Sequence, residues 1–247
     1  MGITLAMSLR DIVAEFVDKP PTSVRVIMIH LRRAKERESL IDALSDSIGM
    51  PLEIHEAVDG TELIARGHPT TCGIHPGLHR TAGEIGCAES HLAAYRSALA
   101  AGFSHLVVFE DDCAAVEEFS FLALRTYLSR ASTFADEFSM SGMKEFVLLS
   151  TCGCYEWRHL TRGVKATNHF NGSHAYIIGR DMMQKVLDMY DVFSAMGQTA
   201  PIDGVLPLLL RLQDQWVFCP ENDTALFKQN RSIPSYVISN GDSLRKD

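Results

Sequence analysis

The sequence has no long apolar run, no excess of basic residues and no regular spacing of cysteines. No stretch approaches the roughly 20 consecutive apolar residues that a membrane-spanning helix requires. The 23 Lys and Arg residues are outnumbered by 31 Asp and Glu, so the net charge is −8. That balance argues against a general nucleic-acid binder, which needs a basic surface. It does not exclude an anionic small ligand, because a local basic cluster or a bound cation reverses the local field.

The six cysteines lack the spacing of a disulfide framework, and a chain of 247 residues can bury a core without cross-links. We therefore expect a reducing, cytoplasmic compartment. Residues 1–21 have no basic segment followed by an uninterrupted apolar one, so they do not resemble a signal peptide. They predict an amphipathic N-terminal extension that ends at Pro20-Pro21 and could contact a partner or the inner face of the membrane. Its few cations disfavour strong binding to anionic lipid.

Strand and helix patterns alternate along the chain. The strand patterns lie at 24–29, 51–60 (ending in a turn), 105–109, 145–150 and 174–178. The helical patterns lie at 40–48, 83–102, 117–138, 181–190 and 204–213. This alternation predicts an α/β fold with a mainly parallel open sheet flanked by helices. We expect one domain over 22–240 and a short tail at 241–247.

Residues 65–83 are rich in Gly, Pro, His and Thr and carry no periodicity, which predicts a long loop. Within it, His68, Cys72, His75 and His79 have a spacing that a zinc site could use. Four ligands from one short irregular segment are geometrically awkward. We therefore favour a mobile lid over a zinc site.

Three consecutive acids, Glu110, Asp111 and Asp112, end the strand pattern at 105–109. Adjacent carboxylates repel one another, so a purely structural strand end gains nothing from them. At the carboxyl end of a buried strand we expect them to converge on a crevice, where a divalent cation removes the repulsion. Hard oxygen ligands suit Mg²⁺ or Mn²⁺. The alternative is a solvated acidic turn before the next helix.

Three further features could belong to the same crevice. A basic segment at 30–37 follows the first strand and could meet a diphosphate or a nucleobase; the alternative is an exposed charged turn. Gly172 enters a strand and permits close approach of a ligand. Asp203 precedes an apolar helix and, taken alone, is best explained as its N-cap.

Together these segments resemble glycosyltransferase family 25, which includes bacterial lipooligosaccharide β-1,4-galactosyltransferases and collagen galactosyltransferases. Order and spacing agree from about residue 24 to about residue 237. The pairing of GEIGCAESH with FEDD is specific, whereas each motif alone is weak. The segments that carry the resemblance are HLRRAKER (30–37), AVDG (57–60), GEIGCAESHLAAYR (83–96), VVFEDDC (107–113), GSHAYIIGRDMMQKVL (172–187) and PIDGVL (201–206).

The resemblance implies a GT-A type fold, a UDP-sugar donor and a Mn²⁺ or Mg²⁺ ion held on the diphosphate by the acidic motif. Glu110, Asp111 and Asp112 would occupy that motif, with Asp112 as the direct ligand and Asp111 nearer the ribose or sugar. The residues that the resemblance places along the donor are His30, Arg32, Arg33, Arg37, Asp59, Gly60, Gly83, Ser90, His91, Asp111, Gly172 and Ser173.

Family members invert at the anomeric carbon, so one carboxylate must accept the proton of the attacking hydroxyl. Asp203 matches the acid of the family's proline-x-acid element, and we expect it to be the base, with Glu84 as second choice. Two departures stand out. Gly204 replaces the tryptophan that often follows this acid, and no histidine follows His174, so a late metal ligand must come from His174, Gln229 or water.

The sequence thus predicts a metal-dependent inverting hexosyltransferase that moves galactose from UDP-galactose to a glycan hydroxyl, for example on lipooligosaccharide. UDP-glucose and UDP-N-acetylglucosamine are alternative donors, because donor choice depends on a few contacts. A non-catalytic nucleotide-sugar-binding or scaffolding protein on the same fold is the alternative from another class.

Two tryptophans, Trp157 and Trp216, lie in or beside apolar patterns, so we expect both in the core. For the first of them a second interpretation stays open. Tyr155, Glu156 and Trp157 together could form a platform on which an acceptor sugar stacks.

Overall fold

A computed structural model describes residues 8–150, 153–172, 174–221 and 225–230. Its helices are α1 (Leu9–Phe16), α2 (Glu38–Ser47), α3 (Gly60–Ala65), α4 (Ala82–Ala100), α5 (Phe121–Glu137), α6 (Arg180–Ala195) and α7 (Ile202–Leu212), with 3-10 turns at Pro21–Ser23, Lys35–Arg37 and Ser141–Glu145. Its strands are β1 (Val24–His30), β2 (Glu53–Glu56), β3 (His105–Glu110), β4 (Cys113–Ala115), β5 (Phe146–Leu148), β6 (Gly153–Thr161), β7 (Val164–Asn171), β8 (Ala175–Gly179), β9 (Val217–Pro220) and β10 (Phe227–Gln229).

Eight of these strands form one sheet in the order β2-β1-β3-β8-β5-β9-β7-β6, and β4 and β10 form a second, two-stranded sheet. β1 runs parallel to β2 and β3, and β5 runs parallel to β9. β8 is antiparallel to both of its neighbours, and β7 is antiparallel to β6 and β9. The α/β class and the flanking helices are confirmed. The sheet, however, is mixed and not mainly parallel.

The β6–β7 hairpin explains much of this difference. The residues of β6 and β7 are largely polar, so no strand pattern was predicted there, although an Arg162-Gly163 turn separates them. Gly163 has φ 79°, a conformation that L side chains rarely adopt. The hairpin adds two antiparallel pairs to the sheet, because β7 is antiparallel both to β6 and to β9.

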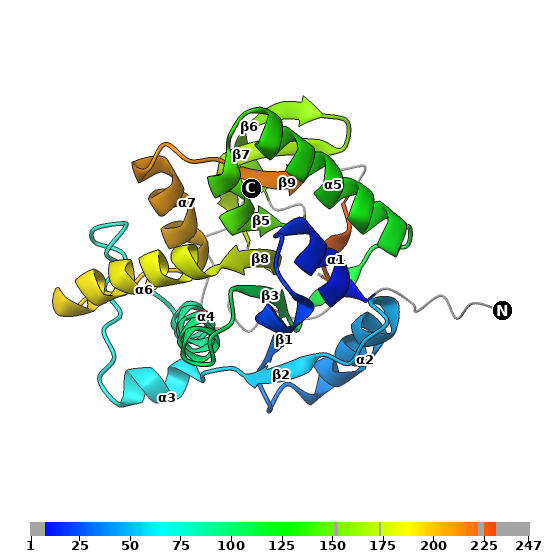
Figure 1. Ribbon diagram of the computed structural model, residues 1–247. Helices are drawn as coiled ribbons and strands as arrows, with labels where there is room; N and C mark the ends of the chain where they lie inside the picture. Colours follow the sequence, from blue (N-terminus) through cyan, green and yellow to red (C-terminus); the bar gives the residue numbers. More distant parts are fainter. Residues whose placement is uncertain (1–7, 151–152, 173, 222–224, 231–247) are drawn as a thin grey trace.

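Helices cover both faces of the large sheet. The core on one face contains residues of α1, α2 and α5, and the core on the other contains residues of α4, α6 and α7, as Figure 1 shows. The strand predicted at 24–29 is buried along almost its whole length, in agreement with coverage on both faces. The predicted helices at 83–102 and 181–190 correspond to α4 and α6.

The amphipathic segment near the N-terminus forms α1. A capping box between Ser8 and Asp11 stabilises the start of this helix. Its apolar residues, among them Leu9, Val13 and Phe16, are buried in the core and pack against α5 and β1. That face is therefore covered inside the molecule and is not a surface for a membrane or a partner. Across the described ranges, no helix has both the length and the apolar character that crossing a bilayer requires.

The segment before α4 is irregular, as predicted, but it is tied down at several points. Thr71 and His79 form an isolated bridge, and Cys72 forms another with Thr199. The Gly73 N–H donates to the Thr199 carbonyl over 2.8 Å. These contacts place the loop against the chain that leads into α7.

Candidate active site

The carboxyl ends of β1 and β3 open into a cleft of about 340 Å³. The two strands are parallel with Ile29 opposite Glu110, so the basic segment after β1 and the acids after β3 meet at the same edge. The start of α3 and the first half of α4 form the opposite wall. The predicted site residues that line this cleft are Arg33, Arg37, Asp59, Gly60, Gly83, Ser90, His91, Glu110, Asp111 and Asp112.

The other predicted residues lie around the cleft or away from it. His30 is buried beneath the cleft, where it contacts Asp111. Arg32 is 80% exposed and pairs with Glu56 on β2 over 3.0 Å. Glu84, Gly172 and Asp203 are not among the lining residues. Ser173 lies outside the described residues.

Asp111 is an anchor for the segment that follows β1. Its Oδ2 lies 2.9 Å from His30 Nδ1 and accepts the Leu31 N–H over 3.4 Å, and its Oδ1 pairs with the buried Arg37 guanidinium. A buried carboxylate is stable only when it is paired in this way. Both oxygens of Asp111 are thus engaged by protein groups.

Asp112 has a different environment. Its Oδ2 accepts a hydrogen bond from Gln229 Nε2 over 3.0 Å, whereas its Oδ1 is buried with no hydrogen-bond partner among the described residues. Burial and the nearby charge of Glu110 raise the pKa of Asp112 to about 6. A buried carboxylate oxygen without a donor is costly, so this atom fits a cation ligand.

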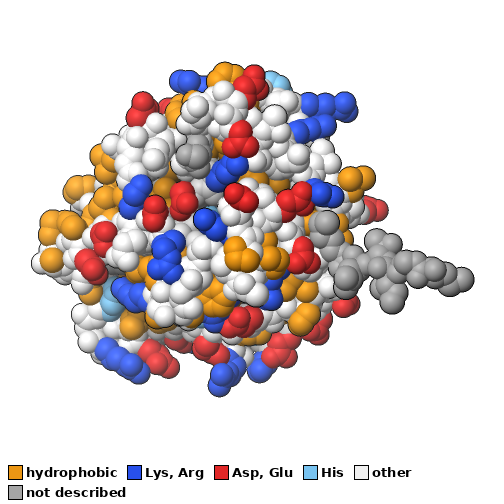
Figure 2. All heavy atoms as spheres, in the orientation of Figure 1, with side chains coloured by type: hydrophobic (Ala, Val, Ile, Leu, Met, Phe, Trp, Pro, Cys, Tyr) orange, Lys and Arg blue, Asp and Glu red, His pale blue; other side chains and the backbone are white. Residues whose placement is uncertain are grey.

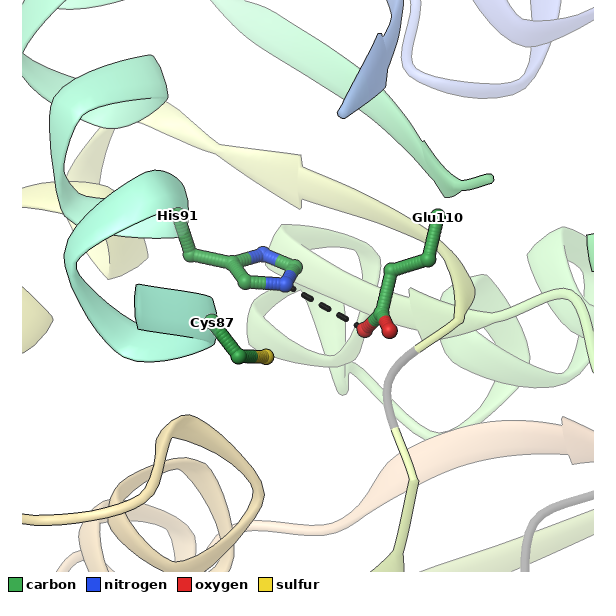
Figure 3. Close-up of side chains that lie close together, drawn as sticks. All are labelled: Cys87, His91 and Glu110. Atoms are coloured by element: carbon green, nitrogen blue, oxygen red, sulfur yellow. Dashed lines mark hydrogen bonds and ion pairs between the residues drawn. The ribbon is translucent and has the colours of Figure 1, made fainter. Parts of the chain in front are cut away.

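Glu110 turns toward α4. Its Oε1 lies 3.2 Å from His91 Nε2, and Cys87, one helical turn before His91, lies on the same side (Figure 3). Its backbone N–H donates to the carbonyl of His174 over 3.0 Å. Of the two candidates for a late ligand, Gln229 therefore contacts Asp112 by its side chain, and His174 contacts Glu110 through its backbone.

The three acids do not converge on one point. Within the described residues, the group of three metal-type ligands that lie within 4.8 Å of one another is Cys87, His91 and Glu110, without Asp111 or Asp112. Glu110 is the last residue of β3, whereas Asp111 and Asp112 lie in the turn before β4, and each acid meets a different part of the protein. All three acids line the cleft, as expected, but their carboxylates do not surround one point.

A buried hydrogen-bonded chain lies behind Glu110. His91 Nδ1 is 2.6 Å from the Tyr176 hydroxyl, which is 2.5 Å from the Tyr95 hydroxyl. Every proton is used if Tyr95 donates to Tyr176, Tyr176 donates to His91 Nδ1, and His91 Nε2–H donates to Glu110. The reverse order leaves the Tyr95 proton without an acceptor among the described residues.

This order bears on the Cys87–His91–Glu110 group. It directs an N–H bond, not a lone pair, at Glu110, so it disfavours a metal ion among the three. The Cys87 thiol fits the same conclusion. Burial and the charge of Glu110 raise the pKa of that thiol well above its usual range, which keeps it protonated.

Two glycines of the predicted motifs build the cleft wall. A Cβ on Gly60 would lie 1.8 Å from the Ala82 carbonyl oxygen, and one on Gly86 would lie 2.6 Å from the Val58 carbonyl oxygen. Ser90 joins the same backbones, because its Oγ donates to the Gly86 carbonyl over 2.5 Å and accepts the Val58 N–H over 2.8 Å. These residues hold α3 against α4.

The two candidate bases differ in their surroundings. Glu84 forms a capping box with Thr81 at the start of α4 and an ion pair with Arg80 at 2.9 Å. Asp203 is not the N-cap of α7, which is Pro201. It lies in the first turn and accepts the Gly172 N–H over 3.5 Å.

The electrostatics of Asp203 link it to the cleft. Burial, followed by the charges of Glu110 and Glu84, raises the pKa of its carboxyl above the usual range. Gly204 stands where the family often has tryptophan, and it lies close to Ile74 and Pro201. A Cβ at this position would be 3.1 Å from each of these side chains.

The four residues considered for a zinc site, His68, Cys72, His75 and His79, make other contacts. His68 contacts Glu89 over 3.3 Å, and His79 contacts Thr70 over 2.9 Å. Cys72 Sγ instead accepts hydrogen bonds from Arg80 Nη2 over 3.1 Å and from the His75 N–H over 3.3 Å. Among the described residues these four side chains do not form a group of metal ligands, so the structure does not support the zinc interpretation.

Some relevant residues were not predicted. Tyr95, Tyr176 and Cys87 appeared in the sequence only as members of motifs, without a role of their own. The spacing of Cys87 and His91, four residues apart on one helix face, was the available signal. Trp157, expected in the core, is 54% exposed, whereas Trp216 packs partly buried against the core.

Comparison with known proteins agrees with this arrangement. Residues 24–205, most of the chain, match the family described as "Glycosyltransferase family 25 (LPS biosynthesis protein)". A Drosophila melanogaster protein named "Glycosyltransferase 25 family member" is 33% identical over an alignment of 96 residues that covers 36% of this chain. That match spans only 16% of the Drosophila protein. The matched span contains the acids after β3, the helix that carries His91, and Asp203: the chain belongs to glycosyltransferase family 25.

Proposed function

We propose that this chain is a metal-dependent inverting glycosyltransferase that moves a hexose, first of all galactose from UDP-galactose, to a hydroxyl of a glycan acceptor such as lipooligosaccharide. Family membership supports glycosyl transfer. The observation that carries the metal-dependent form is the buried Oδ1 of Asp112, which has no hydrogen-bond partner in the described part of the chain and borders the cleft.

The cleft suits a nucleotide diphosphate better than the net charge suggests. Arg33 lies at its rim, half exposed, and pairs with Asp59 over 2.7 Å. Arg37 lies deeper, where Asp111 holds it. A diphosphate that enters would meet these guanidinium groups on one wall and the backbone at the start of α4 on the other.

Asp112 and Glu110 would hold the divalent cation, and Asp111 is left out because Arg37 and His30 occupy it. Two carboxylates suffice, since Mg²⁺-like ions are usually completed by substrate phosphates and water. When bound, such a cation supplies stabilisation of the negative charge on the departing diphosphate.

Asp203 is the proposed base. As the acceptor oxygen bonds to the anomeric carbon, the bond from that carbon to the diphosphate oxygen breaks, and the nucleoside diphosphate leaves with the electron pair. The hydroxyl proton passes to the Asp203 carboxylate, whose raised pKa makes it a stronger base than an ordinary aspartate. Glu84 is less suited, because Arg80 and the helix cap already engage it.

The test measures UDP release from UDP-galactose, UDP-glucose and UDP-N-acetylglucosamine, each with Mn²⁺ and with EDTA. We expect release with Mn²⁺, loss with EDTA, and a fall of about 100-fold or more in Asp112→Asn. Asp46→Asn, which alters an exposed acid on α2, is the matched control and keeps full activity. Circular dichroism checks that both variants fold.

Two results would overturn the proposal. If UDP release persists both in EDTA and in the Asp112→Asn variant, the reaction does not depend on a metal ion. Calorimetric binding of a UDP-sugar without release from any of the three donors would favour the non-catalytic nucleotide-sugar-binding alternative.

A further inference from the structure

The wall of the cleft that α4 forms carries mostly small side chains. The α4 residues that line the cleft are Ala82, Gly83, Gly86, Cys87, Ser90 and His91. Ser90 is bonded to neighbouring backbone atoms, and the His91 imidazole faces Glu110. Cys87 lies one turn before His91, and its thiol is a small, weakly polar group on the same wall. The thiol is therefore placed to contact a ligand inside the cleft.

Cys87 lies between the end of β3 and the start of α7. Its Sγ is within 4.8 Å of ligand atoms of His91 and Glu110, and Figure 3 shows the Cys87 and His91 side chains extending from α4 toward Glu110. α4 contacts both β3, which ends at Glu110, and α7, whose first turn carries Asp203. The proposed cation ligands and the proposed base thus belong to elements on two sides of this helix.

The charges that act on the thiol agree with this position. Burial first, and then the charges of Glu110, Asp203, Asp112 and Glu84, raise the pKa of Cys87 well above its usual range. Carboxylates therefore lie near the thiol both on the side of the proposed cation and on the side of the proposed base. The protonated thiol adds an apolar surface, and not a charge, to the space between them.

Inverting transfer determines what occupies that space. The acceptor oxygen attacks the anomeric carbon from the face opposite to the departing diphosphate, so the sugar ring lies between the base and the diphosphate. In the proposed function the diphosphate lies on the side of Asp112 and Glu110, and Asp203 accepts the proton. The ring therefore lies beside the part of α4 that carries Cys87.

We infer that Cys87 forms part of the subsite for the donor hexose, where its side chain contacts the sugar ring and limits the size of the group that fits. The inference rests on the proposed function for the placement of the sugar. Sulfur is polarizable and packs well against the C–H face of a pyranose. The other side of Cys87 packs against the core formed with α6 and α7, so a larger side chain has no room to withdraw from the cleft.

The binding test compares UDP with donor analogues that keep their sugar. Calorimetry with Mn²⁺ measures the Kd of UDP and of the 2-deoxy-2-fluoro analogues of UDP-galactose and UDP-glucose, in which the fluorine slows loss of the diphosphate. We expect Cys87→Leu to raise the Kd of both analogues by about ten-fold or more and to keep that of UDP within about two-fold of wild type. Ala100→Leu, at the exposed last residue of α4, is the matched control and changes none of these values.

Cys87→Ala keeps the inference testable if the leucine variant does not fold. Alanine removes the thiol without adding bulk, so the Kd of the analogues should rise by about three-fold because contacts with the ring are lost. The Kd of UDP should stay unchanged, since UDP has no hexose. Circular dichroism checks that every variant folds.

Three results would overturn the inference. The first is an equal rise in the Kd of UDP and of the analogues in Cys87→Ala, which would make the thiol structural. The second is an unchanged Kd of the analogues in both folded variants. The third is the absence of binding of either analogue to wild type.

UDP release from the natural donors decides the proposed function separately. Wild type that releases UDP, with variants that do not distinguish the analogues from UDP, contradicts the subsite alone. Wild type that binds an analogue but releases no UDP contradicts the proposed function, and the Kd comparison then still decides whether Cys87 contacts the hexose.

Discussion

Asp203 accepts a hydrogen bond from the N–H of Gly172, which follows β7, and its pKa is raised by burial and by the charges of Glu110 and Glu84. Its raised pKa has an energetic cost. In the folded protein the carboxyl gives up its proton less readily than in the unfolded chain, so ionisation at neutral pH lowers the free energy of unfolding. The residue is thus arranged for proton transfer and not for stability.

Asp203→Asn tests this directly. We expect kcat to fall by at least about 100-fold, because the amide cannot accept the proton. The free energy of unfolding in urea at neutral pH should rise, since asparagine removes the cost of ionisation and keeps an acceptor for Gly172. In wild type, kcat/KM should fall with decreasing pH through a pKa above that of ordinary aspartate. A variant that is both active and less stable would contradict this role.

His91 provides a second prediction at the scale of single residues. The Tyr95–Tyr176 chain favours a proton on Nε2 of His91, aimed at Glu110. Nitrogen-15 NMR of the wild-type protein should show that tautomer. Tyr176→Phe removes the donor to Nδ1, and we expect the Nε2 tautomer to lose population and kcat to drop about ten-fold.

Tyr127→Phe is the control for that experiment, because this buried hydroxyl donates to the Leu148 carbonyl and is not part of the chain. It should leave the His91 signals unchanged. A wild-type Nδ1 tautomer would contradict the assignment and would make Cys87, His91 and Glu110 available to a metal ion.

Among the elements, the contact between α3 and α4 shapes the cleft. Gly86 lies against the backbone at Val58 and Gly60, and Ser90 fastens the same segment. A sequence motif rich in glycine suggests phosphate binding, yet here the glycines permit two backbones to touch. The wall of the cleft depends on that contact.

Gly86→Ala should therefore destabilise the protein by about 2 kcal/mol, because the new methyl group would lie 2.6 Å from the Val58 carbonyl oxygen and force α3 away. Urea unfolding measures the loss, and the KM for the donor should rise as the wall moves. Gly142→Ala is the control, since its nearest neighbour is a side-chain nitrogen at 3.7 Å. Equal stability of the two variants would contradict the close approach.

The sequence predicted most of the helices and the buried strands β1, β3, β5 and β8, whereas it missed α3, β9 and the β6–β7 hairpin. Apolar periodicity marks an element that buries one face, as in α2. β6 lies at the edge of the sheet and exposes much of its length, so it lacks that pattern. The positions of Tyr155 and Trp157 were open to interpretation for the same reason.

At the scale of the whole molecule, the net charge of −8 has to be compared with where the charged side chains lie. Figure 2 shows acidic and basic side chains interspersed over the face in view. Several acids are engaged by cations, including Asp111 with Arg37 and Asp59 with Arg33. The net charge of −8 therefore says little about the local field at the cleft.

Global stability should depend on pH through His105, which begins β3 between β1 and β8. Burial and the charge of Lys19 lower its pKa to about 4. As the pH falls below about 6.5, the unfolded chain binds a proton first, so the free energy of unfolding decreases until about pH 4, by at most about 3 kcal/mol.

His105→Asn should flatten this dependence in urea unfolding series measured between about pH 7 and about pH 4. The pKa of Asp112 is raised by folding, whereas that of His105 is lowered, so the two groups change the free energy of unfolding in opposite directions as the pH falls. The prediction is therefore tested by comparing the variant with wild type and not on wild type alone. His159→Asn, at an exposed histidine paired with Glu221, should keep the wild-type slope. Identical slopes for His105→Asn and wild type would contradict the prediction.

The sequence by itself determined the α/β class, the segments that meet at the cleft, and the family, because these depend on local patterns and on motif order. Only the tertiary structure decided what each side chain does. Asp111 pairs with Arg37, Asp112 has one oxygen without a donor among the described residues, and Glu110 faces His91, because the chain turns directly after β3. The mixed sheet and the exposed rings of β6 likewise depend on long-range strand order, which local patterns do not encode.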